Sequence, residues 1–203
     1  MAARTPLTLL RTHNVTNQPP PLENYNLYST DSALRDAVIR EGGSELQGPL
    51  ISFGEILGRE ETIRSGRLAN ENIPKLRSFD RYGQRIDEVE FHPSYHHMMQ
   101  LGREAGITAT AWSAKHPHGH VQHTAAQYML TQIEPGVSCP LCMTYAVVPA
   151  LRNNPEISAL WEPKLTNHSY DPRCIPPAEK TSLTMGMAMT EKQGGSDVRS
   201  NTT

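Results

Sequence analysis

The chain has 203 residues, with 19 basic and 21 acidic side chains and a formal net charge of −2. This length corresponds to about one to one and a half domains, so a single domain is the default expectation. The chain has no excess of basic residues that could bind the phosphates of a nucleic acid. We therefore do not expect it to bind nucleic acid well alone. No apolar run approaches the ~18 residues that a membrane-spanning helix needs, so a soluble protein is predicted.

Leu, Ile, Val and Phe together make up only about 19% of the residues. That content lies near the limit of about 20% below which disorder is expected when the net charge is also high. Because the net charge is small, we interpret the chain as part of a larger assembly or as a truncated piece. The three cysteines, an odd number, argue against a disulfide scaffold and indicate a reducing compartment, the cytoplasm or alternatively the mitochondrial matrix.

Residues 1–22 are predicted to form an extended N-terminal arm. Arg4 and Arg11 without an acid before Glu23 are also typical of a mitochondrial presequence. The prolines at 6 and 19–21 break a helix and favour instead a polyproline arm laid on another surface.

Helical spacing of apolar residues dominates the chain from residue 30 to residue 161. Cap residues at 30–32 and the glycines at 42–43 bound the first expected helix, and Pro93 takes the first position of another. Val121, Ala125, Met129 and Ile133 are four residues apart and predict one helix face. The expected helices cover about 30–42, 46–57, 60–68, 93–106, 121–133, 140–151 and 155–161.

Two segments do not follow the helical pattern. A Gly83-centred turn within 79–91 predicts a small hairpin or ordered loop between two helical groups. Residues 182–190 alternate polar or small residues with apolar ones, as a strand does. The sequence therefore predicts a mainly α fold, with a helical domain over 23–178 and the truncated start of a β domain over 179–203.

The segment from Met187 to Asp197 reads MAMTEKQGGSD. A strand that runs into Thr190 and then into Gly-Gly-Ser-Asp exposes backbone N–H groups where no Cβ blocks close approach. Such a turn can hold a phosphate or the edge of a heteroaromatic ring. An ordinary surface loop has the same composition.

Thr190-Glu191 followed by Gly195-Ser196-Asp197 resembles the flavin-binding strand and loop of acyl-CoA dehydrogenases. The intervening Lys192-Gln193-Gly194 departs from the common pattern and is similar to the AidB-like branch of that family. Further segments resemble the same branch, from about residue 11 onward: THNV at 12–15, NQP at 17–19, GRLAN at 66–70, FHP at 91–93, CP at 139–140, MT at 143–144 and SNTT at 200–203.

The resemblance implies the N-terminal helical domain, with the first β strand, of an FAD-dependent enzyme that desaturates an acyl-CoA. By position, Thr190 and the backbone of Met187 and Met189 would contact the flavin, and Gly195 would belong to the same cofactor-binding loop. Ser196 would lie near the pyrophosphate and the acyl-CoA. The family's catalytic carboxylate has no counterpart here, so the chain is expected to be inactive alone, and the full-length protein is expected to form a homo-oligomer. The same branch leaves open a DNA-protecting role with residual activity.

A zinc-binding module is the remaining alternative. His116, His118, His120 and His123 precede the Cys139-x-x-Cys142 pair, and imidazole and thiolate ligands can close a tetrahedron. A single C-x-x-C pair is only half a site, however, and it falls in a predicted helix. We therefore predict no metal site and expect both thiols to face the core, next to an apolar helix face formed by Met143, Ala146, Val147 and Ala150.

Overall fold

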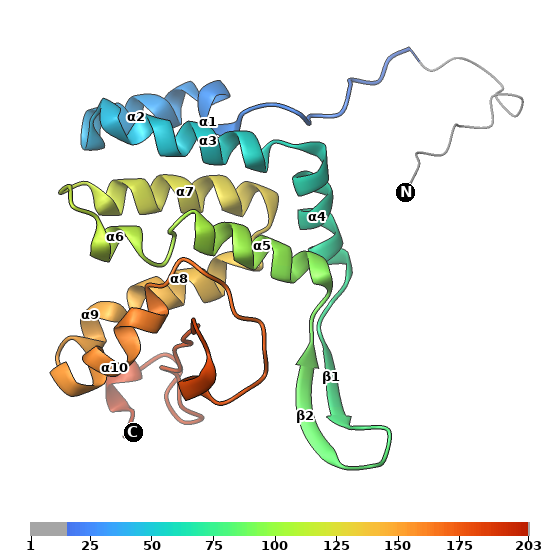
Figure 1. Cartoon of the computed structure of the whole chain (residues 1–203), viewed down its shortest axis with the longest axis vertical. Helices are drawn as coiled ribbons and strands as arrows, with labels where there is room; N and C mark the ends of the chain where they lie inside the picture. Colours follow the sequence, from blue (N-terminus) through green and yellow to red (C-terminus); the bar gives the residue numbers. More distant parts are fainter. Residues whose placement is uncertain (1–15, 203) are drawn as a thin grey trace, which may run out of the picture.

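The computed structural model describes residues 16–202, and its elements are helices and one hairpin (Figure 1). Most of the helices lie in three layers, α1–α3, then α5–α7, then α8–α10, while α4 runs across their ends. The mainly α fold is as predicted. The α-helices are α1 (Leu27–Thr30), α2 (Ser32–Gly42), α3 (Gln47–Leu57), α4 (Glu60–Glu71), α5 (Pro93–Glu104), α6 (Thr110–Ser113), α7 (Gly119–Ile133), α8 (Ser138–Ala146), α9 (Val148–Leu151) and α10 (Pro155–Leu165). Short 3-10 turns are η2 (Ser44–Leu46), η3 (Pro177–Glu179) and η4 (Val198–Ser200).

The helix starts follow local capping chemistry. The Asp31 carboxylate accepts the Leu34 N–H at 2.9 Å and caps the start of α2. The helix ends before Gly43, whose φ of +84° favours glycine. His92 caps α5 through its ring Nδ1, with Pro93 at the first helical position. These boundaries agree with the sequence because each one depends only on residues within a few positions. The predicted arm over 1–22 lies, for residues 1–15, outside the described residues.

The helix predicted over 140–151 is divided into α8 and α9. Pro149 has no N–H, so it cannot bond the carbonyl of Tyr145 four residues earlier. That carbonyl instead accepts the indole N–H of Trp112 at 3.0 Å. Two further differences concern length: α10 continues past Trp161 to Leu165 in spite of Pro163, and α6 is too short to leave a periodic pattern.

The hairpin consists of β1 (Lys75–Phe79) and β2 (Arg85–Glu90), which pair antiparallel with Leu76 opposite Val89. This confirms the predicted hairpin and extends it upstream, with a register shift between Arg77 and Phe79. Asp80 accepts the Tyr82 and Gln84 N–H groups in the turn. The hairpin projects from the helical layers (Figure 1), and nearly all of its residues are exposed.

The core lies between the upper two layers and α8. Its largest members are fully buried side chains on α1, α3, α5, α7 and α8: Tyr28, Leu50, Leu57, Met98, Met99, Met129, Leu130 and Leu141. α4 passes close to the end of α7 at Gly66, where an added Cβ would collide with the Ile133 carbonyl oxygen. The small residue therefore sets how closely the crossing helix can lie.

Residues 182–190, which we call the extended segment, form neither a helix nor a paired strand among residues 16–202. The sequence alternation is that of a strand, and a strand needs a hydrogen-bonding neighbour. Here Leu183 donates its N–H to the carbonyl of Lys164 on α10 at 3.1 Å. The helical body thus takes the place of a neighbouring strand, and the division into two domains near residue 179 stays a prediction.

Candidate functional site

The predicted flavin-contact residues lie in a segment that leaves the helical body after Met185. Leu183 is buried, and the Met185 N–H is bonded to the Thr144 hydroxyl on α8 at 3.0 Å. Beyond this point the side chains turn to solvent, with Met187 62% and Met189 57% exposed. Two unbranched apolar side chains this exposed favour a surface that another body covers.

Thr190, Gly195 and Ser196 are also exposed. No hydrogen bond among the described residues uses the Thr190 hydroxyl. An added Cβ at Gly195 meets no heavy atom within 4 Å. All five predicted residues, which lie within residues 187–196, are therefore exposed, with a free hydroxyl at Thr190 and open space around Gly195.

The loop that follows is closed by three polar residues. Asn201 donates its side-chain N–H to the carbonyl of Met189 at 2.5 Å, and the Thr202 N–H contacts the Glu191 carboxylate at 3.1 and 3.2 Å. Gly194 donates its N–H to the Glu191 carbonyl at 3.1 Å. The loop therefore folds on itself and holds the backbone of Met189 beside Asn201.

Gly194 and Asn201 carry structural roles that sequence reasoning had not assigned. Gly194 is buried, and a Cβ there would collide with the Asn201 side-chain oxygen. That oxygen is itself buried without a hydrogen-bond partner among the described residues. A buried acceptor without a donor is costly, which fits a loop that takes its final hydrogen bonds from another group.

These observations fit one edge of a flavin and no more of it. The exposed Thr190 hydroxyl can donate or accept, the bare Gly195 admits a phosphate, and the orphaned Asn201 oxygen lies against neighbouring Gly194. A cofactor of this size needs most of its surface buried. Residues 187–196 alone offer a single strip of contact.

The histidines of the zinc alternative are used in other contacts. The ring Nδ1 of His123 lies 2.7 Å from the Ile107 carbonyl, and the buried ring stacks on Tyr145 with centroids 3.7 Å apart. Burial lowers the pKa of His123. His120 bonds the Tyr145 hydroxyl at 2.8 Å, and His116 lies 3.2 Å from the side chain of Gln122. Among residues 16–202, no three His, Cys, Asp or Glu side chains are grouped so that they could hold a metal ion.

The prediction that Cys139 and Cys142 face the core is wrong, because both are exposed. On α8 the buried side chains are Leu141 and Thr144, three residues apart on one face. Cys139 lies two positions, or about 200° of helix rotation, before Leu141, and therefore points away from that face. The apolar face predicted from the sequence is therefore rotated relative to the face that α8 buries.

A crevice of about 500 Å³ lies between β2, α5 and residues 170–184. Within it the ring Nδ1 of His96 lies 2.8 Å from the Tyr170 hydroxyl. Burial lowers the pKa of His96 and raises that of Tyr170. Tyr95 stacks on Phe91 with centroids 4.2 Å apart. The first contact ties α5 to residues 170–184, and the second ties the base of the hairpin to α5.

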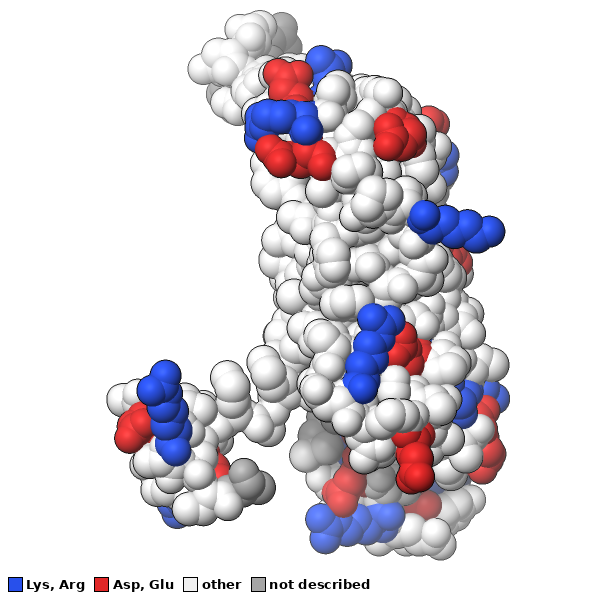
Figure 2. All heavy atoms as spheres, turned by 90° about the vertical axis from the view of Figure 1, so that its left-hand side faces the viewer, with Lys and Arg blue, Asp and Glu red and all other residues white. Residues whose placement is uncertain are grey.

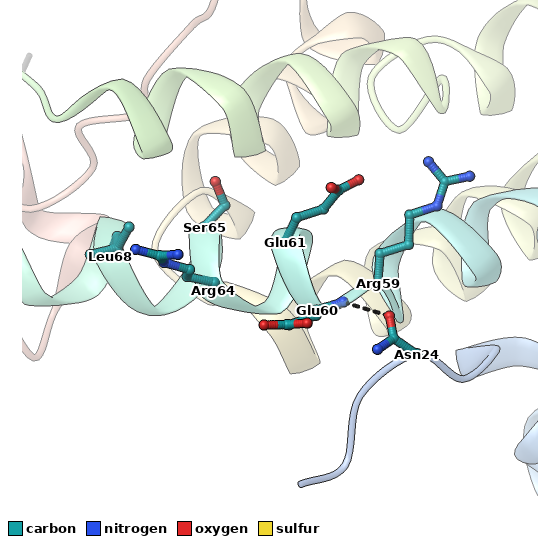
Figure 3. A pocket seen from close by; sticks show the side chains of 7 residues that line it. All are labelled: Asn24, Arg59, Glu60, Glu61, Arg64, Ser65 and Leu68. Atoms are coloured by element: carbon teal, nitrogen blue, oxygen red, sulfur yellow. Dashed lines mark hydrogen bonds between the residues drawn. The ribbon is translucent and has the colours of Figure 1, made fainter. Parts of the chain in front are cut away.

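A second cavity, of about 480 Å³, opens at the start of α4 (Figure 3). Two arginines and two glutamates of the first turns surround it, and the Asn24 side chain accepts the Glu60 N–H at 3.2 Å. The lining residues are Asn24, Arg59, Glu60, Glu61, Arg64, Ser65 and Leu68. With both signs of charge present, this cavity favours neither an anion nor a cation.

Basic and acidic side chains are interspersed over the face drawn in Figure 2, and neither sign forms a continuous patch there. None of the helices between residues 16 and 202 has the length and apolar character to cross a membrane.

Two solved structures share this fold. The structure of Bd2924 in its apo form superposes with a TM-score of 0.77 at 25% identity, over 93% of this chain and 37% of that one. The Caenorhabditis elegans ACDH-11 structure, in complex with C11-CoA, gives 0.76 at 22% identity, over 100% of this chain and 34% of that one. The architecture is that of the helical part of acyl-CoA dehydrogenase-like proteins.

At the level of sequence, residues 17–172 match the model of the adaptive response protein AidB N-terminal domain, and the chain belongs to that family. It is 44% identical to the putative acyl-CoA dehydrogenase AidB of Escherichia coli K12 over 195 residues. It is 29% identical to the acyl-CoA dehydrogenase family member 11 of C. elegans over 170 residues. The chain spans 36% and 27% of the lengths of these two relatives, and 95% and 83% of its own length is aligned.

Proposed function

We propose that this chain forms the N-terminal part of an FAD-dependent acyl-CoA dehydrogenase-like protein and contributes one strand and loop to its flavin site. The observation that carries the proposal is the exposed segment 187–196, which leaves the helical body with Thr190 unbonded and Gly195 open. The family relationship supports the same reading, since the relatives bear acyl-CoA dehydrogenase names.

In this proposal each residue has one task. The Thr190 hydroxyl, the backbone groups of Met187 and the backbone N–H of Met189 bond the polar edge of the flavin, while the Met189 carbonyl stays bonded to Asn201. Gly195 lets the backbone approach the pyrophosphate, and Ser196 lies beside it. The bound flavin supplies a two-electron acceptor for the hydride of the acyl chain.

An acyl-CoA is the proposed substrate, and the C11-CoA in the related C. elegans structure supports that class. This chain holds no residue to which the family resemblance assigns the proton-abstracting carboxylate. Binding of both ligands therefore requires the further two thirds of length that the relatives possess. A homo-oligomer is proposed for that longer protein.

The test joins this chain to the remaining part of the E. coli relative, in place of the relative's own matched segment. The expected product is a yellow protein with about one flavin per chain, measured by absorbance and by release of FAD on denaturation. The intact relative, purified in parallel, is the reference. A folded chimera that stays colourless while the reference carries flavin contradicts the proposal. Reduction of the bound flavin by a series of acyl-CoA esters then tests the reaction.

The isolated 203-residue chain is the matched control. We expect it to bind FAD weakly, because it buries only one strip of the cofactor. A stoichiometric yellow complex of these residues alone would show that the site is complete within the chain.

A further inference from the structure

The guanidinium of Arg103 on α5 is fully buried and bonds only backbone carbonyls. It donates to Leu165 at 2.9 Å, Lys164 at 3.1 Å, Ser169 at 3.2 Å and Leu183 at 3.2 Å. The first two belong to the last turn of α10, where carbonyls lack a helical N–H partner and a cation is favoured. The fourth belongs to the extended segment that leads to Met187.

This cation is expensive to bury. Burial lowers the pKa of Arg103 to about 10, and no carboxylate among residues 16–202 forms an ion pair with it. An apolar side chain of similar volume would fill the space without that desolvation cost. The planar guanidinium carries several N–H donors, so it can bond α10 and the extended segment at the same time, which an apolar side chain cannot do. The geometry thus gives Arg103 a task beyond packing.

A second hydrogen bond holds the extended segment two residues further on. The hydroxyl of fully buried Thr144 donates to the Pro140 carbonyl at 2.7 Å and accepts the Met185 N–H at 3.0 Å. Leu183 is thus held by its carbonyl and Met185 by its N–H, the i and i+2 alternation of a strand beside its neighbour. Both partners are side chains of the helical body.

We propose that Arg103 and Thr144 are positioning residues, a two-point clamp on Leu183 and Met185 that fixes where residues 187–196 leave the helical body. The relevance to flavin rests on the proposed function, whereas the clamp itself does not. Without the clamp, the Leu183 N–H still bonds Lys164. Further back, Thr181 is held by the Asp171 carboxylate, which accepts its N–H at 3.0 Å, and by the Asn167 side chain, which donates to its carbonyl at 3.2 Å.

The test is amide hydrogen exchange on the full 203-residue chain, with Arg103→Met, Arg103→Lys and Thr144→Val. In Arg103→Met we expect the Leu183 and Met185 amides, the two that are hydrogen-bonded in this segment, to exchange about tenfold faster or more, since hydrogen bonds to a charged group are lost. Thr144→Val should accelerate both amides about 5-fold, the Met185 amide most of all. Arg103→Lys, with its charge retained but its fork lost, should fall between wild type and Arg103→Met.

Thr131→Val is the matched control, because its hydroxyl lies on the exposed side of α7 and bonds Gln127 and Ser138. It should leave the Leu183 and Met185 amides unchanged. In the clamp variants, amides of α2–α4 report global stability and should accelerate far less than those of Leu183 and Met185. Equal acceleration across the chain, or unchanged exchange at Leu183 and Met185, overturns the clamp. If Arg103→Met fails to fold, Thr144→Val and Arg103→Lys decide the question by the same criterion.

The flavin enters only in a second arm, in the chimera described above. Arg103→Lys and Thr144→Val should weaken FAD affinity there, and Thr131→Val should not. If the clamp variants show locally accelerated exchange but the parent chimera binds no flavin, the proposed function is contradicted and the clamp is supported. Flavin binding that is unaffected by both clamp variants would overturn the positioning role.

Discussion

The indole N–H of Trp112 donates to the carbonyl of Tyr145, the same carbonyl that Pro149 leaves without its helical partner. The two rings also stack, with centroids 5.1 Å apart, and the Arg152 guanidinium lies over the Trp112 ring at 5.3 Å. A break between α8 and α9 is thus stabilised from α6, a helix of four residues.

Trp112→Phe should lower the free energy of unfolding by about 1–3 kcal/mol, because it leaves that carbonyl without its donor. Trp161→Phe is the control: it also truncates an indole, and no hydrogen bond of the Trp161 N–H is present among the described residues. Urea unfolding followed by circular dichroism measures both. Equal losses for the two variants would show that ring volume, not the hydrogen bond, carries the effect.

Gly66→Ala should destabilise the chain by about 1–3 kcal/mol, since the added methyl group pushes α4 away from the Ile133 carbonyl. Gly48→Ala, in the first turn of α3, is the matched control, because its added Cβ meets no atom of another segment within 4 Å. Its effect should be smaller, since the gain in helix propensity is offset by contact of the new Cβ with the ring of Pro49. The difference between the two identical substitutions is read from thermal or urea unfolding. A stabilised Gly66→Ala protein would mean that the two helices are further apart than described.

Stability should fall as the pH is lowered through about 6.5, the ordinary pKa of histidine. Burial lowers the pKa of His123 in the folded chain, so the unfolded chain binds its proton first and gains population on acidification. His123→Phe keeps a ring against Tyr145 and removes the titration. Its unfolding free energy should change less between pH 7.5 and pH 5.5 than that of the wild type. An unchanged slope would assign the pH dependence to other groups.

All three cysteines should react with a thiol reagent in the folded chain, because all three are exposed. Without denaturant, the reagent should release three equivalents of its own thiolate per chain. Metal analysis of chelator-free protein should find no stoichiometric zinc. Cys142→Ser should reduce the count to two. One zinc per chain that is lost in Cys142→Ser would instead establish the metal site.

The helix boundaries could be predicted from sequence wherever capping is local, as at Asp31 and at His92-Pro93. The features that sequence could not supply depend on distant residues. The division of α8 from α9 has a local signal in Pro149, but the donor that bonds the freed Tyr145 carbonyl, Trp112, is more than 30 positions away. The hydrogen bonds of Leu183 and Met185 come from α5, α8 and α10. Arg103 would be expected at the surface from its residue type alone.

The candidate site follows the same division. Resemblance located Met187, Met189, Thr190, Gly195 and Ser196, which the structure places together in one exposed segment. Composition alone could not separate that segment from an ordinary loop. The loop closure through Asn201 was missed, because an asparagine that bonds a carbonyl twelve residues away leaves no local pattern.

The most direct measurement of the central claim is the FAD affinity of the flavin-reconstituted chimera with Thr190→Val. This change removes one hydroxyl and conserves shape, so it should leave a flavin group unpaired at a cost of about 1–3 kcal/mol. Titration of the apoprotein should then show affinity reduced about 5- to 150-fold with the fold intact. Lys192→Ala, two residues along the same exposed loop, should have much less effect. Equal FAD affinity in the two variants would contradict the placement of Thr190 at the flavin.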